Sequence, residues 1–239
     1  MKITILTFIF VTAFIVSSRS QEIVGGYSLG YGSYQLRDIK KDQIQAFNNI
    51  NATYVDVKIM EDFPGWIFQE FYIGYKFGNS EAGGRYNYYT TSGRNYLADY
   101  SGCYRNDIFI KGNVLGVYYK VYFIDFPLSE TVRFDMNFTI TGGLIFNKYI
   151  SEESLEIYNR PSANKLNTVT YKSVNGFFLP SFTPQVWIKE YIGINLNIGY
   201  EIDIQSYLFK NTNGDNIGVN WTGIRISLGV CGKIPLQKK

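Results

Sequence analysis

The sequence contains no histidine and only two cysteines. Hydrolases of the Ser-His-Asp or Asp-His type need an imidazole to move a proton near neutral pH, so these mechanisms are excluded. Zinc sites built on histidine or on several thiolates are excluded for the same reason. We therefore expect no metal ion and no cofactor.

Long apolar runs are also missing, except near the start of the chain. Residues 3–16 are almost entirely apolar, follow Lys2 and precede Ser18-Arg19-Ser20. This layout is typical of a signal peptide, and the run is too short to cross a bilayer as a helix. We expect residues 1–20 to be a cleaved signal peptide and residues 21–239 to form one exported domain.

No excess of one charge sign is present. The chain carries 23 basic and 20 acidic residues, for a formal net charge of +3, and its charges are scattered singly. Nucleic-acid binding needs a concentrated basic stripe. We expect no nucleic-acid partner.

What the sequence does contain is alternation, most clearly over residues 191–205. Every second side chain there is large and apolar, and those between are glycine, amide or acidic. Such a pattern predicts an extended strand with one apolar and one polar face. Its length suits a tilted strand that crosses a bilayer, which needs about 9 to 11 residues.

Similar alternation recurs along the chain and predicts an all-β fold, an eight-stranded antiparallel up-and-down transmembrane β-barrel. Pro180 and Pro184 each remove a backbone donor, so we expect a bulge or an early end in the sixth strand. The expected strands are residues 25–34, 66–77, 84–92, 107–124, 131–142, 174–187, 191–205 and 219–232.

The expected connections alternate between long and short. The first long loop has helical periodicity from Leu36 to Ile50, which predicts a short amphipathic helix that caps the barrel or binds a partner. Residues 93–106 and 151–171 are polar and are predicted to be the second and third long loops, and residues 79–83 a tight turn. Cys103 and Cys231 then lie near opposite ends, too far apart for a disulfide.

The polar faces carry charges that balance within one residue, which favours a packed, ion-paired interior and no open pore. Glu201 and Asp203 could support acid–base chemistry, but pairing with Arg133 and Arg225 is the simpler interpretation, and we expect no enzymatic activity. The nine residues of this predicted structural network are Glu70, Lys76, Arg85, Lys120, Arg133, Asp135, Glu201, Asp203 and Arg225.

Four features together resemble small Gram-negative outer-membrane β-barrel proteins of the OmpA/OmpX-like type. They are the signal, the start GGYSLGYGSYQLRDIKK, the segment TTSGRNYLADYSG from Thr90 to Gly102, and the final strand. The resemblance implies insertion into the outer membrane, long loops facing outside, and roles in adhesion, envelope integrity or host contact. It implies no catalytic residues.

Three functions remain open at this point. The first is a non-enzymatic, monomeric outer-membrane barrel that contacts the lipid bilayer and an extracellular partner through its loops. The second is a small ligand-binding or transport barrel. The third is a soluble, exported lipocalin-like binder, in which the apolar faces would point inward. Glycine and charge share one face in several strands, which favours a cramped, paired interior and hence the membrane barrel.

Overall fold

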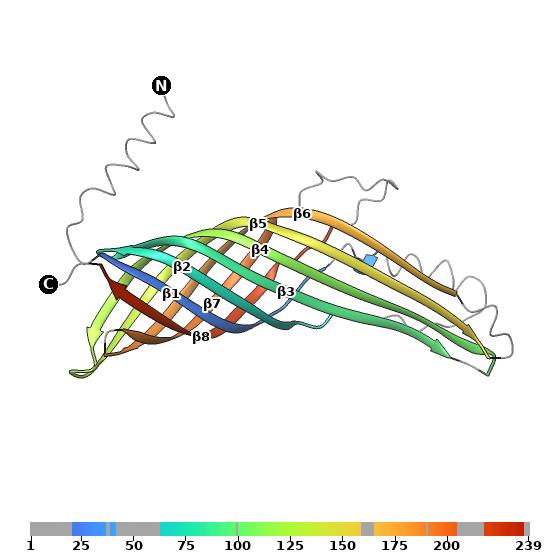
Figure 1. The fold of residues 1–239 in the computed structure, drawn as a ribbon, viewed down its shortest axis with the longest axis horizontal. Coiled ribbons are helices and arrows are strands. Elements are labelled where there is room, and N and C mark those ends of the chain that lie inside the picture. Colours follow the sequence, from blue (N-terminus) through green and yellow to red (C-terminus); the bar gives the residue numbers. More distant parts are fainter. Residues whose placement is uncertain are drawn as a thin grey trace, which may run out of the picture.

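In the computed structural model, eight strands form one closed barrel, and each strand is antiparallel to both neighbours (Figure 1). The structure describes residues 21–36, 39–41, 63–98, 100–158, 165–189, 191–204 and 218–236. The predicted eight-stranded up-and-down β-barrel is confirmed. The strands are β1 (Gln21–Gly32), β2 (Trp66–Phe77), β3 (Ser80–Ala98), β4 (Gly102–Pro127), β5 (Val132–Ile157), β6 (Lys165–Ile188), β7 (Ile192–Ile204) and β8 (Gly223–Pro235).

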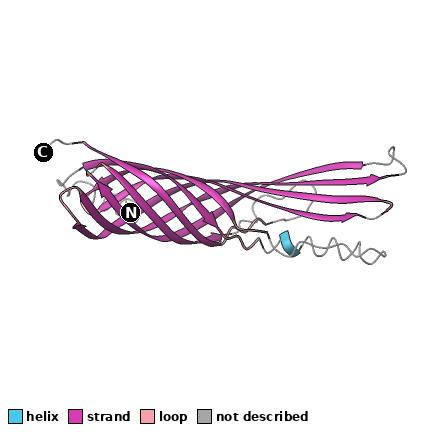
Figure 2. Cartoon of the chain, turned by 90° about the horizontal axis from the view of Figure 1, so that it is seen from below, coloured by secondary structure: helices cyan, strands magenta, loops and turns pink. Residues whose placement is uncertain are grey.

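Four neighbouring strands are much longer than the barrel requires. β3 to β6 have 19, 26, 26 and 24 residues, whereas the other four strands have 12 or 13. Their extra length continues past the barrel as an open sheet at the end away from β1's first residue (Figure 2). We call residues 89–98, 102–112, 147–157 and 165–173 the protruding sheet.

The protruding sheet corrects two predicted loops. The described residues of 93–106 and 151–171 lie mostly in paired strands. The prediction failed because polar composition was taken as a loop signal. Strand pairing is made by backbone groups, so these polar segments pair without the apolar alternation that marks a half-buried strand.

The sixth strand passes through both prolines without the expected bulge or early end. β6 keeps one register with β5 from Ile188 to Lys165. Its pairs with β7 skip residues 179–180 and 183–184, so the prolines interrupt the ladder on that side alone. The irregularity of the barrel lies elsewhere, at Phe123 of β4, where the register with β5 shifts between Tyr122 and Ile124.

The turn between β2 and β3 is shorter than predicted. It consists of Gly78 and Asn79, and β3 begins at Ser80. Gly78 has a φ of 59°, in the left-handed region that glycine adopts without steric cost. The consequence is that Glu81, which was assigned to the turn, becomes a strand residue that faces the barrel interior.

The structure describes part of the predicted helix and none of the predicted signal peptide. Residues 39–41 are helical, and Leu36 and Ile39 are fully buried. The remainder of the Leu36 to Ile50 segment, apart from these positions, lies outside the described residues, as do residues 1–20.

Among the described residues, no helix combines the length and the apolar character that crossing a membrane as a helix requires.

Candidate functional site

The two faces of β7 differ sharply in chemistry. On β7, Ile192, Ile198 and Ile204 are 63%, 45% and 59% exposed on the outside, whereas Glu201 on the opposite face is completely buried. A lipocalin-like binder would show the reverse arrangement, with apolar side chains inside. The structure therefore contradicts the soluble lipocalin-like alternative.

The outward side chains form a continuous apolar surface around the barrel, which we call the apolar belt. Its exposed members come from seven of the eight strands, and β3 adds the half-buried Tyr86 and Tyr88. Representative members are Leu29, Tyr31, Ile67, Phe71, Ile73, Leu115, Val117, Phe123, Ile140, Leu144, Phe182, Ile194, Leu196, Ile226, Leu228 and Val230.

Two ion pairs in the barrel interior are joined by hydrogen bonds into one chain of contacts. Arg225 Nη2 lies 2.8 Å from Glu201 Oε1, and the Tyr89 hydroxyl donates to Glu201 at 2.5 Å. Asn87 Nδ2 donates to the Tyr89 oxygen at 3.1 Å, and Arg85 Nε lies 3.4 Å from Asn87 Oδ1.

The chain of contacts ends at Glu70, which pairs with Arg85. The Arg225 guanidinium also stacks over the Tyr34 and Tyr89 rings, with centroids 4.9 and 4.8 Å away. Charges with this many donors, acceptors and rings around them can remain buried, because the contacts offset the cost of desolvation.

Glu81 is the centre of a second group of interior contacts, and sequence analysis did not predict it as an interior residue. Its side chain is fully buried, lies 3.0 Å from Lys120 Nζ, and accepts hydrogen bonds from the hydroxyls of Tyr118 (2.7 Å) and Tyr122. The spacing could have identified it, because Glu81 lies four residues before Arg85 and an even spacing places two strand residues on the same face.

Glycine makes room for this cluster. A Cβ atom on Gly74 would lie 2.2 Å from the Tyr118 hydroxyl, so a larger residue there would displace the ring that donates to Glu81. Gly74 is paired with Gly83 on β3, where an added Cβ would meet the backbone of β2. This pair of glycines is what allows Tyr118 to reach across to Glu81.

Three predicted network members lie near the end of the barrel with the short turns. Asp135 is buried and accepts a hydrogen bond from the Trp187 indole nitrogen at 2.6 Å. Lys76 places its ammonium 3.8 Å from the centre of the Tyr122 ring. Arg133 is not an interior residue, because its side chain is 44% exposed at the rim and pairs with Asp125. The proposed pairing of Arg133 with Glu201 or Asp203 is therefore wrong.

Asp203 also differs from expectation, since none of the ion pairs among the described residues includes it. Its carboxylate accepts hydrogen bonds from the Asn175 amide, at 3.1 and 3.0 Å, and from the Trp221 backbone nitrogen, at 2.8 Å. Neutral donors thus hold this residue in place. The two inward carboxylates of β7 are buried in separate surroundings.

The mouth of the barrel next to the protruding sheet is filled by an apolar cluster. Leu36, Ile39 and Phe63 of the first connection and Val219 and Trp221 of the last one pack onto inward-facing strand residues. Those strand residues are Phe68, Tyr89, Ile108, Ile110, Val114, Ile145, Tyr149, Phe177 and Leu179. This apolar plug was not predicted, because the inner face was expected to be polar throughout.

The interior contains a small cavity, which Glu70, Arg85, Tyr118 and Lys120 help to line. Its volume is about 30 Å³, which is room for one or two water molecules. In the described part of the chain, no three His, Cys, Asp or Glu side chains are arranged to hold a metal ion. Cys103 and Cys231 are both free thiols.

A third group of charges lies on the outer face of the protruding sheet. Asp107 pairs with Arg94, at 2.6 Å between Nε and Oδ1, and with Arg105. Burial alone would raise the pKa of Asp107, but the hydrogen bonds and charges of the two arginines outweigh it and lower the pKa below its usual value. Asp107 therefore stays ionised well into the acid range.

Comparison with known proteins gives structural similarity without sequence similarity. No protein-family model and no curated protein matches the chain. Solved structures that are similar include the attachment invasion locus protein Ail of Yersinia pestis in complex with the heparin analogue sucrose octasulfate, at 10% identity and a TM-score of 0.35, covering 90% of this chain and 98% of that one. Ail alone gives 12% identity and a TM-score of 0.33, over 90% of this chain and 98% of Ail.

Neisserial surface protein A (NspA) is also similar, at 12% identity and a TM-score of 0.38, over 90% of this chain and 97% of that one. At these identities and scores the likeness concerns the fold alone. The fold itself is established by the strand pairing of this chain.

Proposed function

We propose that the protein is a non-enzymatic outer-membrane β-barrel, exported through a cleaved signal peptide, that contacts partners outside the cell through its protruding sheet. The apolar belt carries this proposal. Leaving so many large apolar side chains in water would be very unfavourable, whereas hydrocarbon solvates them. A closed barrel is the sheet structure that a bilayer accepts, because no strand edge is left unpaired in lipid.

The interior supports a structural role for its charges. Glu70, Glu81 and Glu201 each have a cationic partner, and the cavity beside Glu70 has space for one or two waters. A catalytic or transport site needs a path for its substrate. The apolar plug and the packed ion pairs leave no such path among the described residues.

The protruding sheet supports an interaction role. Beyond Tyr88, β3 has no strand partner on its outer edge among the described residues, and the same holds for β6 before Gly176. A strand edge without a neighbouring strand is a template for an extended segment of another protein. The sheet also extends past the apolar belt, where a partner outside the membrane can reach it (Figure 2).

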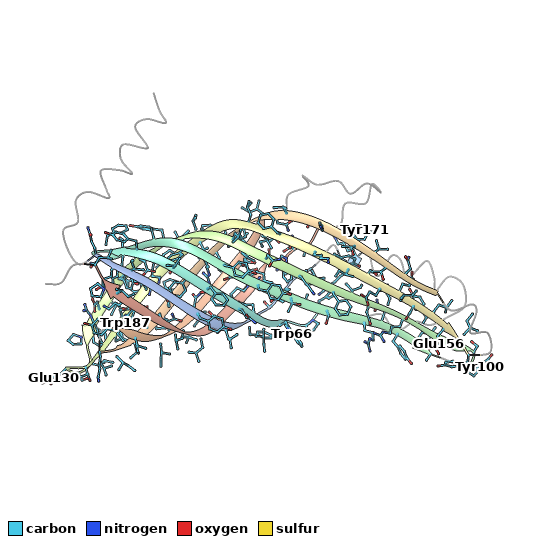
Figure 3. All side chains as sticks on the ribbon, in the orientation of Figure 1. Trp66, Tyr100, Glu130, Glu156, Tyr171 and Trp187 are labelled. Atoms are coloured by element: carbon cyan, nitrogen blue, oxygen red, sulfur yellow. The ribbon has the colours of Figure 1, made fainter. Side chains whose placement is uncertain are left out.

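Topology on intact cells tests this proposal. Tyr100 lies at the tip of the protruding sheet and is 95% exposed, and Glu130 lies in the turn at the opposite end (Figure 3). In a Cys103→Ser background, a membrane-impermeant maleimide is expected to label Tyr100→Cys on intact cells, and to label Glu130→Cys only after the cells are permeabilised.

Fractionation and gel mobility complete the test. The mature protein is expected in the membrane fraction and to change its electrophoretic mobility on heating, as a folded barrel does when it unfolds. Recovery of the protein in the soluble fraction, or equal labelling of both cysteines on intact cells, would contradict the proposal.

A further inference from the structure

Three lysines lie side by side on the outer face of neighbouring strands, at the base of the protruding sheet. Lys111 of β4 is the direct cross-strand partner of Lys148 of β5, and Lys148 is the partner of Lys172 of β6. All three are exposed. β4, β5 and β6 run next to one another through this region (Figure 1), so the three ammonium groups form one row.

The row is unfavourable without a counter-charge. Like charges directly opposite each other on a sheet repel, and no ion pair among the described residues includes any of the three lysines. The next carboxylates on this face, Asp107 and Glu152, lie four residues further along their strands, about 13 Å away. Asp107 is already paired with two arginines.

The row borders the exposed apolar belt on the side of the short turns. Moving from the lysines toward the short turns, the outward residues become Leu115 on β4, Phe146 and Leu144 on β5, and Phe178 on β6, all exposed. The belt on these strands then continues to the turns. Ammonium groups at this height lie where lipid headgroups meet the hydrocarbon, with the lysine stems against the apolar surface.

We propose that Lys111, Lys148 and Lys172 together bind the phosphate of an anionic lipid headgroup in the leaflet around the base of the protruding sheet. This inference rests on the proposed membrane insertion. Three cations on adjacent strands offer one phosphate several charge-assisted contacts, and they gain more from an anionic lipid than from a zwitterionic one. The fourth position of the row, Thr90 on β3, adds a hydroxyl beside Lys111.

Lipid exchange on the inserted protein tests the site. The barrel is placed in nanodiscs of phosphatidylcholine with or without phosphatidylglycerol, and native mass spectrometry then measures which lipids remain bound. The wild type is expected to retain phosphatidylglycerol preferentially. The triple variant Lys111→Gln, Lys148→Gln, Lys172→Gln is expected to lose at least about tenfold in affinity for it, since each cation near an anionic surface contributes measurably.

Two controls separate charge at this site from charge in general. The triple Lys→Arg variant keeps the positive row and is expected to retain the affinity. Lys189→Gln, in the exposed turn at the other end of the barrel, removes a cation away from the row and is expected to change nothing. An unchanged affinity in the triple Gln variant would overturn the site.

Free phosphate is distinguished from lipid in the same assay. Inorganic phosphate added at constant ionic strength is expected to leave the retained phosphatidylglycerol unchanged, and its displacement of the lipid would overturn the assignment to a headgroup. A wild type that inserts but retains both lipids equally contradicts this site alone. A wild type that fails to insert contradicts the membrane proposal itself.

Discussion

Glu81 shows at the level of one residue how the interior charges are held. It faces Lys120 and two tyrosine hydroxyls, and both charged side chains are buried. Removing one partner of a buried pair leaves the other charge uncompensated. We expect Glu81→Gln to lower the free energy of unfolding by about 3 to 5 kcal/mol, measured by urea titration of the protein in vesicles.

The exposed pair Arg133–Asp125 is the matched control. Its side chains are 44% and 39% exposed, so water screens their attraction. Asp125→Asn should cost at most about 1 kcal/mol. Adding Lys120→Met to Glu81→Gln should recover most of the loss, because it removes the orphaned charge. Equal effects of Glu81→Gln and Asp125→Asn would contradict the assignment of Glu81 as a buried anchor.

Asp107 gives a pH-dependent prediction outside the barrel. Its pKa is lower in the folded protein than in the unfolded chain, because Arg94 and Arg105 stabilise the carboxylate. The stabilisation is therefore fully present above the unfolded pKa of about 3.9 and is lost as the pH falls through the folded pKa. Hydrogen exchange in residues 93–106, corrected for intrinsic rates, should stay slow from neutral pH to about pH 4 and accelerate below it.

Asp107→Asn removes the titrating group. Exchange in the same segment should then be faster than in the wild type at neutral pH, and its dependence on acid should disappear. If the variant kept the wild-type pH profile, the ion pairs with Arg94 and Arg105 would not be the cause of that dependence.

At the level of elements, β7 offers a test of membrane depth. Ile198 lies midway along the strand, and Ile204 is its last residue at the end next to the protruding sheet. A lysine on the lipid face costs about 2 to 4 kcal/mol at the bilayer midplane and about 0 to 1 near the interface. Ile198→Lys should therefore destabilise the inserted barrel much more than Ile204→Lys in unfolding titrations from vesicles. Equal costs would argue against a bilayer centred on Ile198.

Alternation predicted the strands best where one face is lipid-facing and the other is packed. The prediction of residues 66–77 coincides with β2, and residues 191–205 differ from β7 by one residue at each end. Residues 93–106 and 151–171 were not recognised as strands because they are mostly polar and lack regular alternation. Glu81 was missed because the two-residue turn at Gly78 leaves more strand than a longer turn would.

The sequence was enough to assign which side chains face inward and outward, but not which interior charge pairs with which. Parity placed Glu70, Arg85, Glu201 and Arg225 on the inner face, where the structure has them. The specific pairs Glu70–Arg85 and Glu81–Lys120 depend on barrel closure and register between strands. The pattern within one strand contains no information about either.

For the whole molecule, the packed interior predicts that the barrel conducts no ions across the membrane. The cavity of about 30 Å³ is too small for a continuous water path, and the apolar cluster fills the mouth near the protruding sheet. Purified protein in planar bilayers should show no steady conductance. Stable, reproducible channels of one size would contradict the closed interior.

The central claim is that aliphatic side chains of this barrel face hydrocarbon and its ion pairs lie within. A scan of single cysteines carrying spin labels from residue 192 to residue 204 of β7, in vesicles, measures it directly. Even-numbered positions should be accessible to lipid-soluble oxygen, and odd-numbered positions such as Glu201 should be protected from both oxygen and water-soluble nickel reagents. Even positions protected from oxygen, with odd positions open to the nickel reagent, would contradict the account.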